Sequence, residues 1–243
     1  MIYYKNMDHH KQKDFIHHHS MVSVSLVREV VFGIEDGMVS TFGAIVGIAT
    51  ATHDPFLVIL TGFVIISVES ISMGVGSFLS SKSERAIQER KLQEEKIEVD
   101  TYIDFETKEL VDLFVADGWP KKISKEMATV ASKNKKLLLK EMAYRELKIF
   151  PDQLDSPAKN ALAMLISYIV GGLIPLTSFV FLPVNTALAV SLPITLAALF
   201  GVGVYTTKFS KRNWFIAGTE MLALATIAGG IGYVVGQVVQ RFA

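Results

Sequence analysis

The chain has 243 residues, half of them hydrophobic, and its 24 Lys and Arg residues balance 24 Asp and Glu residues. The neutral total excludes a nucleic-acid-binding protein that depends on bulk positive charge. The absence of cysteine excludes a disulfide scaffold, thiolate metal sites and cysteine nucleophiles. The charges are unevenly spread: Asn160 to Thr207 is a run of 48 residues without Asp, Glu, Lys or Arg, whereas Lys82 to Asp155 contains 15 basic and 16 acidic residues. We therefore interpret the chain as a membrane protein with a soluble insert.

Five apolar segments are long enough to cross a membrane, because a bilayer core of roughly 30 Å needs about 20 apolar residues in a helix. They are residues 30–51, 56–79, 161–182, 186–205 and 214–239. A short turn at 52–55 joins the first and second segments, and another at 181–184 joins the third and fourth. The first 20 residues are polar and rich in histidine, so we expect no cleavable signal peptide.

These segments predict an all-α fold, a five-helix polytopic membrane protein with a three-helix cytoplasmic insert between membrane helices 2 and 3. The insert lacks Gly and Pro from Lys82 to about Val115, then contains Gly118-Trp119-Pro120, which predicts one long helix that ends there. Two further helices are expected at 121–132 and 133–150. The predicted divisions are a polar His-rich cytoplasmic tail (1–27), membrane helices 1 and 2 (28–81), a cytoplasmic helical metal-binding domain (82–157) and membrane helices 3 to 5 (158–243).

Basic residues set the expected orientation, because Lys and Arg concentrate in cytoplasmic loops. The tail, the insert and the loop before the last helix all contain several Lys or Arg residues, whereas the two short turns contain none and the C-terminal end has only Arg241. We therefore expect the N-terminus and residues 82–157 in the cytoplasm and the C-terminus on the opposite side.

Five carboxylates fall within or at the ends of the predicted membrane helices, and no Lys or Arg lies deep in these helices to pair with them. They are Glu29, Glu35, Asp36, Glu69 and Glu220. A carboxylate in the bilayer is costly, so such residues indicate a path for cations or protons. Helical spacing places Met73 on the same face as Glu69, and a carboxylate with a thioether admits borderline transition metals. The alternatives are that Met73 only packs and that Glu29 is an interfacial residue.

A second group of acids lies in the insert. If its first helix is continuous, Glu84, Glu95, Glu98, Glu106 and Glu109 fall within an arc of about 80° on one face. Like charges at this spacing destabilise a helix, so the stripe suggests a cation site. Glu141, Met142 and Glu146 on the third helix could complete it. The alternative is an ordinary solvated face, since Lys91 shares the stripe.

Other motifs are less specific. GxxxG pairs at Gly33/Gly37, Gly43/Gly47 and Gly232/Gly236 predict close helix packing, within one subunit or between two. Five histidines between His9 and His19 could bind metal, or the tail could be a disordered segment or a remnant of protein expression. The chain has no G-x-x-x-x-G-K-[ST], G-x-S-x-G or H-E-x-x-H motif, so we expect no enzyme, and transport would need an ion gradient.

Two long runs resemble a known family. Phe32-Gly-Ile-Glu-Asp-Gly-Met-Val-Ser-Thr-Phe-Gly-Ala-Ile-Val-Gly47 resembles the first membrane helix of the vacuolar iron transporter family, and Glu69-Ser-Ile-Ser-Met-Gly-Val-Gly-Ser-Phe-Leu-Ser-Ser81 resembles its second. The resemblance covers about residues 28–242, and the five-helix layout with a helical insert after the second helix matches too.

The resemblance implies a homodimeric transporter that moves Fe²⁺ or Mn²⁺ out of the cytoplasm in exchange for protons, without a prosthetic group. It implies Asp36 and Met73 as translocation ligands at the dimer interface, with Glu29 at the cytoplasmic mouth. It also implies a metal-binding insert that uses Glu95, Glu98, Glu106, Glu109, Glu146 and the soft ligand Met142. Glu69 completes the predicted metal-site residues.

Our hypothesis is a divalent transition-metal/proton antiporter, in the plasma membrane of a prokaryote or the vacuolar membrane of a eukaryote. The partners are the lipid bilayer, a second copy of the chain and metal ions, with no nucleic acid. The sequence does not decide whether the protein prefers Fe²⁺ or Mn²⁺. The alternative is a membrane-anchored metal sensor or scaffold without transport, although an anchor has no use for intramembrane acids. A di-iron enzyme would require Glu-x-x-His pairs as iron ligands, and the insert has no histidine.

Overall fold

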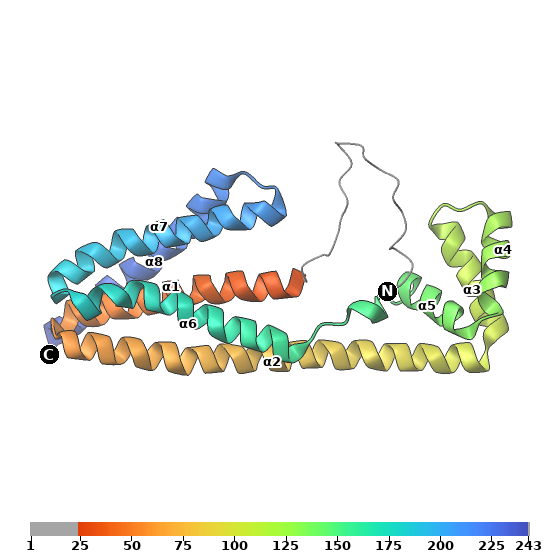
Figure 1. Ribbon diagram of the computed structural model, residues 1–243, viewed down its shortest axis with the longest axis horizontal. Coiled ribbons are helices and arrows are strands. Elements are labelled where there is room, and N and C mark those ends of the chain that lie inside the picture. The colour runs from red at the N-terminus through yellow and green to blue at the C-terminus, as the bar shows by residue number, and fades with distance from the viewer. Residues whose placement is uncertain (1–23, 243) are drawn as a thin grey trace, which may run out of the picture.

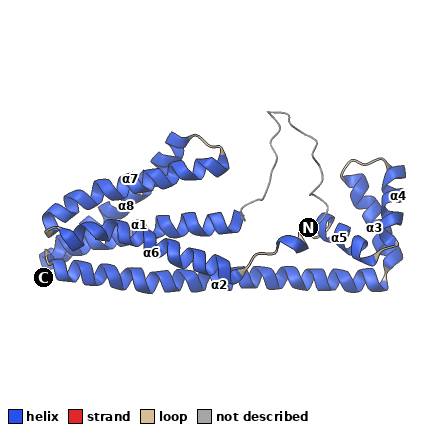
Figure 2. Ribbon diagram, in the orientation of Figure 1, coloured by secondary structure: helices blue, strands red, loops and turns tan. Residues whose placement is uncertain are grey.

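The computed structural model describes residues 24–242, which form eight α-helices, one short 3₁₀ helix and the loops between them (Figure 2). The predictions for the histidines of the tail lie outside the described residues. The elements are α1 (Val24–Thr52), α2 (Pro55–Thr101), α3 (Ile103–Ala116), α4 (Lys121–Ser132), α5 (Lys135–Arg145), η1 (Pro151–Gln153), α6 (Pro157–Phe181), α7 (Val184–Ser210) and α8 (Trp214–Phe242).

Five of these helices, α1, α2, α6, α7 and α8, are long and apolar enough to cross a membrane. They form one bundle, and α2 continues out of it to carry α3, α4 and α5 at its far end (Figure 1). The all-helical fold and the five predicted spans are therefore confirmed over the described residues. Helix α1 begins at Val24, so it extends four residues into the stretch that was predicted as tail.

Helix α2 spans 47 residues and joins the bundle to the insert without a break. Nothing between Gly76 and its end interrupts the helix, as its composition indicates. The predicted continuous helix up to about residue 115 is nevertheless wrong. The chain leaves helical geometry at Tyr102 (φ −125°, ψ 40°), and α3 starts as a separate helix with its own direction. Glu106 and Glu109 therefore lie on a different helix from Glu95 and Glu98.

The helix ends follow from local side chains. Asp54 caps α2 by accepting hydrogen bonds from the backbone N–H groups of Phe56 (2.8 Å) and Leu57 (3.3 Å), with Pro55 in the first turn. Asn134 caps α5 in the same way, which explains why this helix begins at Lys135 and not at the predicted residue 133. It ends at Arg145, earlier than the predicted residue 150, because Lys148 takes a positive φ of 56° and turns the chain.

Close packing of α1 holds the bundle together. On one side Gly171 of α6 lies against the backbone of Ile34, and on the other Gly232 of α8 lies against the backbone of Gly43. A side chain at either glycine would collide with the facing main chain. The glycine pairs of α1 and α8 thus pack within one chain, which is the simpler of the two alternatives that the spacing allowed.

The surface of the five-helix bundle differs from that of the insert, because the bundle is expected to face lipid and the insert water. Phe63 and Val68 on α2 and Ile227 and Val234 on α8 are exposed, as expected for helices that face lipid. The insert instead buries a small core of its own, built by α2, α3, α4 and α5. Its buried members are Val99, Leu110, Phe114, Ala128, Ala131, Leu138 and Met142.

We expect a substitution of Lys211 by glycine to stabilise the protein. Lys211 ends α7 in the left-handed conformation (φ 56°), which costs an L-residue with a Cβ atom roughly 1 kcal/mol. Glycine adopts this conformation freely, so Lys211→Gly should raise the unfolding temperature in detergent. Lys208→Gly is the matched control: it lies in the last turn of α7, where glycine costs about 1 kcal/mol, and should lower that temperature. Equal shifts would contradict the assignment of strain.

Candidate functional site

Three carboxylates from three helical segments of the insert meet at one point. Glu95 comes from α2, Glu106 from the first turn of α3, and Glu146 caps the C-terminus of α5. One carboxylate oxygen of each lies within 4.8 Å of the others. Glu95 and Glu106 are only 2% and 6% exposed, whereas Glu146 is open to solvent. We call this group the insert cluster. Its geometry is that of a small oxygen-ligand site with one side open.

The break at Tyr102 creates the insert cluster. Because α3 starts afresh after Tyr102, Glu106 turns back toward Glu95 instead of continuing along α2. Helix α5 packs against α2, with Leu138 and Met142 buried in the insert core, and this packing brings its C-terminal residue Glu146 to the other two. The cluster is thus a product of tertiary packing.

The insert cluster is costly in the absence of a cation. Glu95 Oε1 and Glu106 Oε2 are buried and have no hydrogen-bond partner among residues 24–242. Burial raises the pKa of Glu95 from 4.5 to about 8, with further contributions from the charges of Glu146, Glu106 and Glu98. Burial is also the largest cause that raises the pKa values of Glu106 and Glu146. A divalent cation would supply the missing partner and the missing charge.

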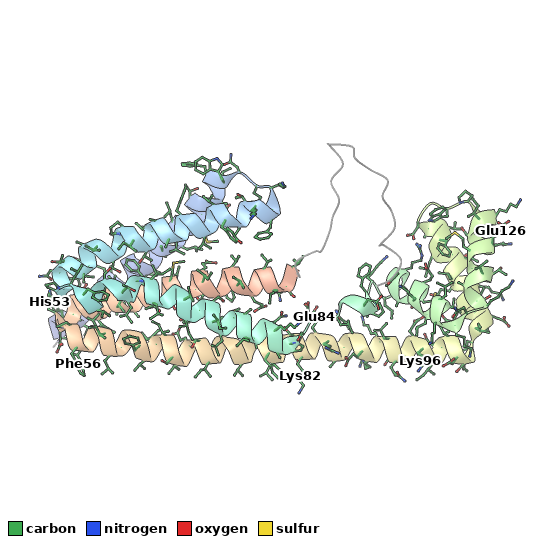
Figure 3. All side chains as sticks on the ribbon, viewed as in Figure 1. His53, Phe56, Lys82, Glu84, Lys96 and Glu126 are labelled. Atoms are coloured by element: carbon green, nitrogen blue, oxygen red, sulfur yellow. The ribbon has the colours of Figure 1, made fainter. Side chains whose placement is uncertain are left out.

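The other predicted residues of the insert have different positions. Glu98 and Glu109 are exposed, but their charges are close enough to raise the pKa of cluster members. Met142 is completely buried in the insert core. Glu84 lies on α2 where this helix leaves the bundle (Figure 3). The predicted single-face stripe is wrong because the break at Tyr102 places Glu106 and Glu109 on α3. Glu141 is paired with Arg145 at 3.2 Å.

In the bundle, a hydrogen bond between Glu29 and Ser77 connects α1 to α2 on the side that is predicted to be cytoplasmic. Glu29 is 6% exposed and accepts hydrogen bonds from the guanidinium of Arg28 (3.0 Å) and the hydroxyl of Ser77 (2.8 Å). The prediction that the acids of the membrane helices lack basic partners is therefore wrong for Glu29. It is also wrong for Glu220, which is exposed and pairs with Arg212 at 2.7 Å. Arg28 lies in the second turn of α1 and Arg212 in the loop between α7 and α8, and their long side chains reach the two acids.

Deeper in the bundle, one tyrosine connects three helices. The hydroxyl of Tyr168 on α6 hydrogen-bonds Glu69 on α2 and lies 2.5 Å from the hydroxyl of Ser40 on α1. Tyr168 is completely buried. Tyr168 is not among the site residues predicted from the sequence. The available signal was a phenol within a 48-residue segment without charges, where a buried hydroxyl requires a partner.

Asp36 differs from the other bundle acids. It is half-buried and makes no hydrogen bond or ion pair with any residue of 24–242. Its carboxylate is close enough to those of Glu35 and Glu69 for mutual repulsion. Met73, half-buried one helical turn beyond Glu69 on α2, supplies a thioether on the same helix. Asp36, Glu69 and Glu35 thus form a region of concentrated negative charge inside the bundle.

Comparisons with known proteins agree with this architecture. The model of the VIT family matches residues 27–237, which is most of the chain. The chain belongs to the VIT family. It is 28% identical over 235 residues to "Vacuolar iron transporter 2" of Oryza sativa subsp. japonica, covering 96% of this chain and 93% of the relative.

Two further relatives come from Tulipa gesneriana and Plasmodium berghei. "Vacuolar iron transporter 1" of Tulipa gesneriana is 26% identical over 235 residues, with 96% of this chain and 93% of the relative covered. "Vacuolar iron transporter" of Plasmodium berghei (strain Anka) is 25% identical over 244 residues, with 96% and 87% covered. The resemblance of the two membrane-helix runs to this family is thereby confirmed, and this VIT-family chain is a multi-pass membrane protein.

The insert cluster yields a prediction in which stability and binding change in opposite directions. Glu95→Gln keeps the shape of the side chain but removes a buried charge, so the metal-free protein should become more stable at pH 8, while Mn²⁺ affinity measured by calorimetry should fall at least about tenfold. Glu94→Gln, an exposed neighbour, is the matched control and should change neither quantity.

The pH dependence gives a second readout of the same variant. The folded protein holds a proton on Glu95 up to a pH of about 8, whereas the unfolded chain releases it near 4.5. Raising the pH through this window therefore favours unfolding of the metal-free protein on account of this group. Glu95→Gln should remove that part of the decline. A decline that is as steep in Glu95→Gln as in the parent would contradict the raised pKa.

Proposed function

We propose that the protein is a transporter of divalent transition metal, Fe²⁺ or Mn²⁺, which it exports from the cytoplasm in exchange for protons. The observation that carries this proposal is the concentration of carboxylates without cationic partners at two places, Asp36 inside the bundle and the insert cluster outside it. The names of the relatives, which are vacuolar iron transporters, support a metal as the cargo.

The orientation follows from the charges of the loops. The insert carries 15 of the 24 basic residues, and Lys208 in the last turn of α7 is followed by Lys211 and Arg212 in the loop to α8, on the same side of the bundle. Basic loops remain in the cytoplasm, so the insert cluster samples cytoplasmic metal. Capture there and release through the bundle amount to export. The membrane is that of the cell in a prokaryote or of the vacuole in a eukaryote.

Electrostatics provide the coupling to protons. The carboxylates of Asp36 and Glu69 repel each other inside the bundle, where the dielectric constant is low, so a cation between them would be favoured. A divalent metal at Asp36, with the thioether of Met73 as a second ligand, would neutralise them. After the metal leaves, protons would have to replace it. The exchange of one divalent cation for protons thus keeps the charge of the bundle nearly constant in both states.

Each residue has a role in the proposed path. The insert cluster concentrates the metal, with Glu98 and Glu109 adding negative charge at its rim. Glu29, held by Arg28 and Ser77, is at the mouth of the bundle. The hydroxyl of Tyr168 fixes the carboxylate of Glu69 and provides a site for proton exchange between Glu69 and Ser40.

We also propose that the protein acts as a homodimer. Ser40 and Gly43 of α1 line an open apolar groove of about 680 Å³ that α8 closes on one side only. The same face of α1 carries Asp36 one turn earlier. A second copy that covers this face would exclude lipid from Asp36 and complete the ligand set there with a second carboxylate and thioether.

The direct test is a flux assay with the purified protein in proteoliposomes under an imposed pH gradient. We expect Mn²⁺ and Fe²⁺ to move against the direction of proton flow. Asp36→Asn, which removes the charge but keeps the shape, should reduce flux to that of empty vesicles. Glu220→Gln is the control, since Glu220 is exposed and paired with Arg212, and should leave flux unchanged. Absence of metal movement with the parent protein would instead favour a membrane-anchored sensor.

A separate prediction concerns Tyr168. Tyr168→Phe removes only the hydroxyl, so Glu69 loses a hydrogen bond. A hydrogen bond to a charged group changes an equilibrium constant by about 10- to 100-fold. We expect proton-driven metal flux to fall by this factor and its dependence on pH to shift. Tyr205→Phe, at an exposed position of α7, should have no effect. Unaltered flux and pH profile in Tyr168→Phe would reduce Tyr168 to a packing residue.

A further inference from the structure

The insert contains a cavity that takes no part in the proposed transport path. It lies between α2, α5 and η1 and has a volume of about 510 Å³, within the range of pockets for small ligands. Helix α2 contributes Lys96 at one end, and α5 contributes Lys136 and Lys140. Lys96 lies well out along α2, beside the helices of the insert (Figure 3).

The charges that line this pocket do not cancel. Its two acids are already paired: Glu89 with Arg85 at 2.8 Å, and Asp152 with Lys140 at 3.6 Å. The side chains of Lys96 and Lys136 make no ion pair or hydrogen bond with any residue of 24–242. Lys135, which pairs directly with Asp100 at 2.8 Å, lowers the pKa of that acid most, and the charge of Lys96 is close enough to lower it further. Two ammonium groups thus line the pocket without a directly bonded acid among the described residues. The complement of this lining is a ligand with two negative charges.

The rest of the pocket suits an organic molecule. Leu92, Leu139 and Pro151 form apolar walls, and the ring of Tyr144 lies beside them, with Lys140 at 5.3 Å from its centroid. An inorganic anion would leave most of the 510 Å³ unfilled. A ligand with an apolar or aromatic body would bury these walls and place its charged end at the lysines.

We propose that this pocket binds a small organic dianion, a phosphate monoester or a dicarboxylate, with its charged group between Lys96 and Lys136 and its apolar body against Leu92, Leu139 and Tyr144. Lysines act as point charges and do not demand the planar, two-pronged geometry that an arginine imposes. They accept either kind of anion, so the choice between the two is left to the shape of the pocket.

Occupancy of the pocket affects the insert cluster through shared helices. Lys96 follows Glu95 directly on α2, so the two charges lie within the screening length of roughly 10 Å at 0.1 M salt. A bound dianion neutralises Lys96, so it raises the affinity of the nearby carboxylate of Glu95 for a cation. By linkage, a bound cation raises the affinity for the dianion equally. This inference goes beyond the proposed function and does not depend on transport.

The test is calorimetry with the full-length, metal-depleted protein in detergent at constant ionic strength. The probes are phenyl phosphate, succinate and inorganic phosphate. We expect saturable binding of phenyl phosphate or succinate, tighter than that of inorganic phosphate. The double variant Lys96→Gln/Lys136→Gln should weaken this binding at least about tenfold. The control Lys121→Gln/Lys122→Gln removes two exposed lysines of α4 outside the pocket and should leave it unchanged.

The outcomes separate the alternatives. Preference for phenyl phosphate identifies a phosphate ester, and preference for succinate identifies a dicarboxylate. Equal weakening in both double variants, or no saturable binding of either organic probe, would overturn the proposal, because the lysines would then act as ordinary surface charges. The unfolding temperature of each variant confirms that it is folded. Because no flux is measured, failure of this proposal leaves the transport proposal intact, and the reverse also holds.

Discussion

The free energy of placing carboxylates out of water is the constraint on which the rest of this protein depends. An ionised carboxylate in an apolar medium must find a cation, a proton or a set of hydrogen bonds. Glu95 and Glu106 are buried with an oxygen each that has no partner in the described chain. Asp36 has no cationic partner in the bundle. The folded protein carries this cost at both places, and a divalent ion would relieve it.

The arginines distinguish the acids that have a cationic partner within the described chain from the acids that have none. Arg28 neutralises Glu29, Arg212 neutralises Glu220, and Arg145 binds both Glu141 and Asp117 while it covers the ring of Phe114 at 4.2 Å. The insert cluster lies next to Arg145 in sequence, yet no arginine enters it. Placement of the positive charges is therefore as informative as placement of the acids.

Helix α2 connects the bundle to the insert as one continuous helix. It carries Glu69 and Met73 within the bundle and Glu95 in the insert, 26 residues beyond Glu69, which corresponds to roughly 39 Å along a helix. An unbroken helix between them keeps the insert at a fixed distance and angle from the bundle (Figure 1). Asn160 of α6 adds a further connection where α2 emerges, because its amide donates to Ser81 at 3.1 Å.

The sequence by itself determined the class of the protein. Five apolar segments, the runs around Asp36 and Met73, and the composition of the insert were enough to predict the helices and the family, because burial in lipid and helical periodicity act locally along the chain. It also identified Glu95, Glu106 and Glu146 as members of one group. It did so for a reason that was partly wrong, since a single helical face does not contain all of them.

The tertiary structure alone decided how these residues meet. The break at Tyr102 has no Gly or Pro signal, and it turns a predicted stripe into a cluster of three segments. The partners of Glu29 and Glu220 depend on side chains that reach across helix ends, and the contact of Tyr168 with Glu69 joins residues 99 positions apart. Periodicity describes one helix at a time, whereas these contacts depend on how separate helices pack against one another.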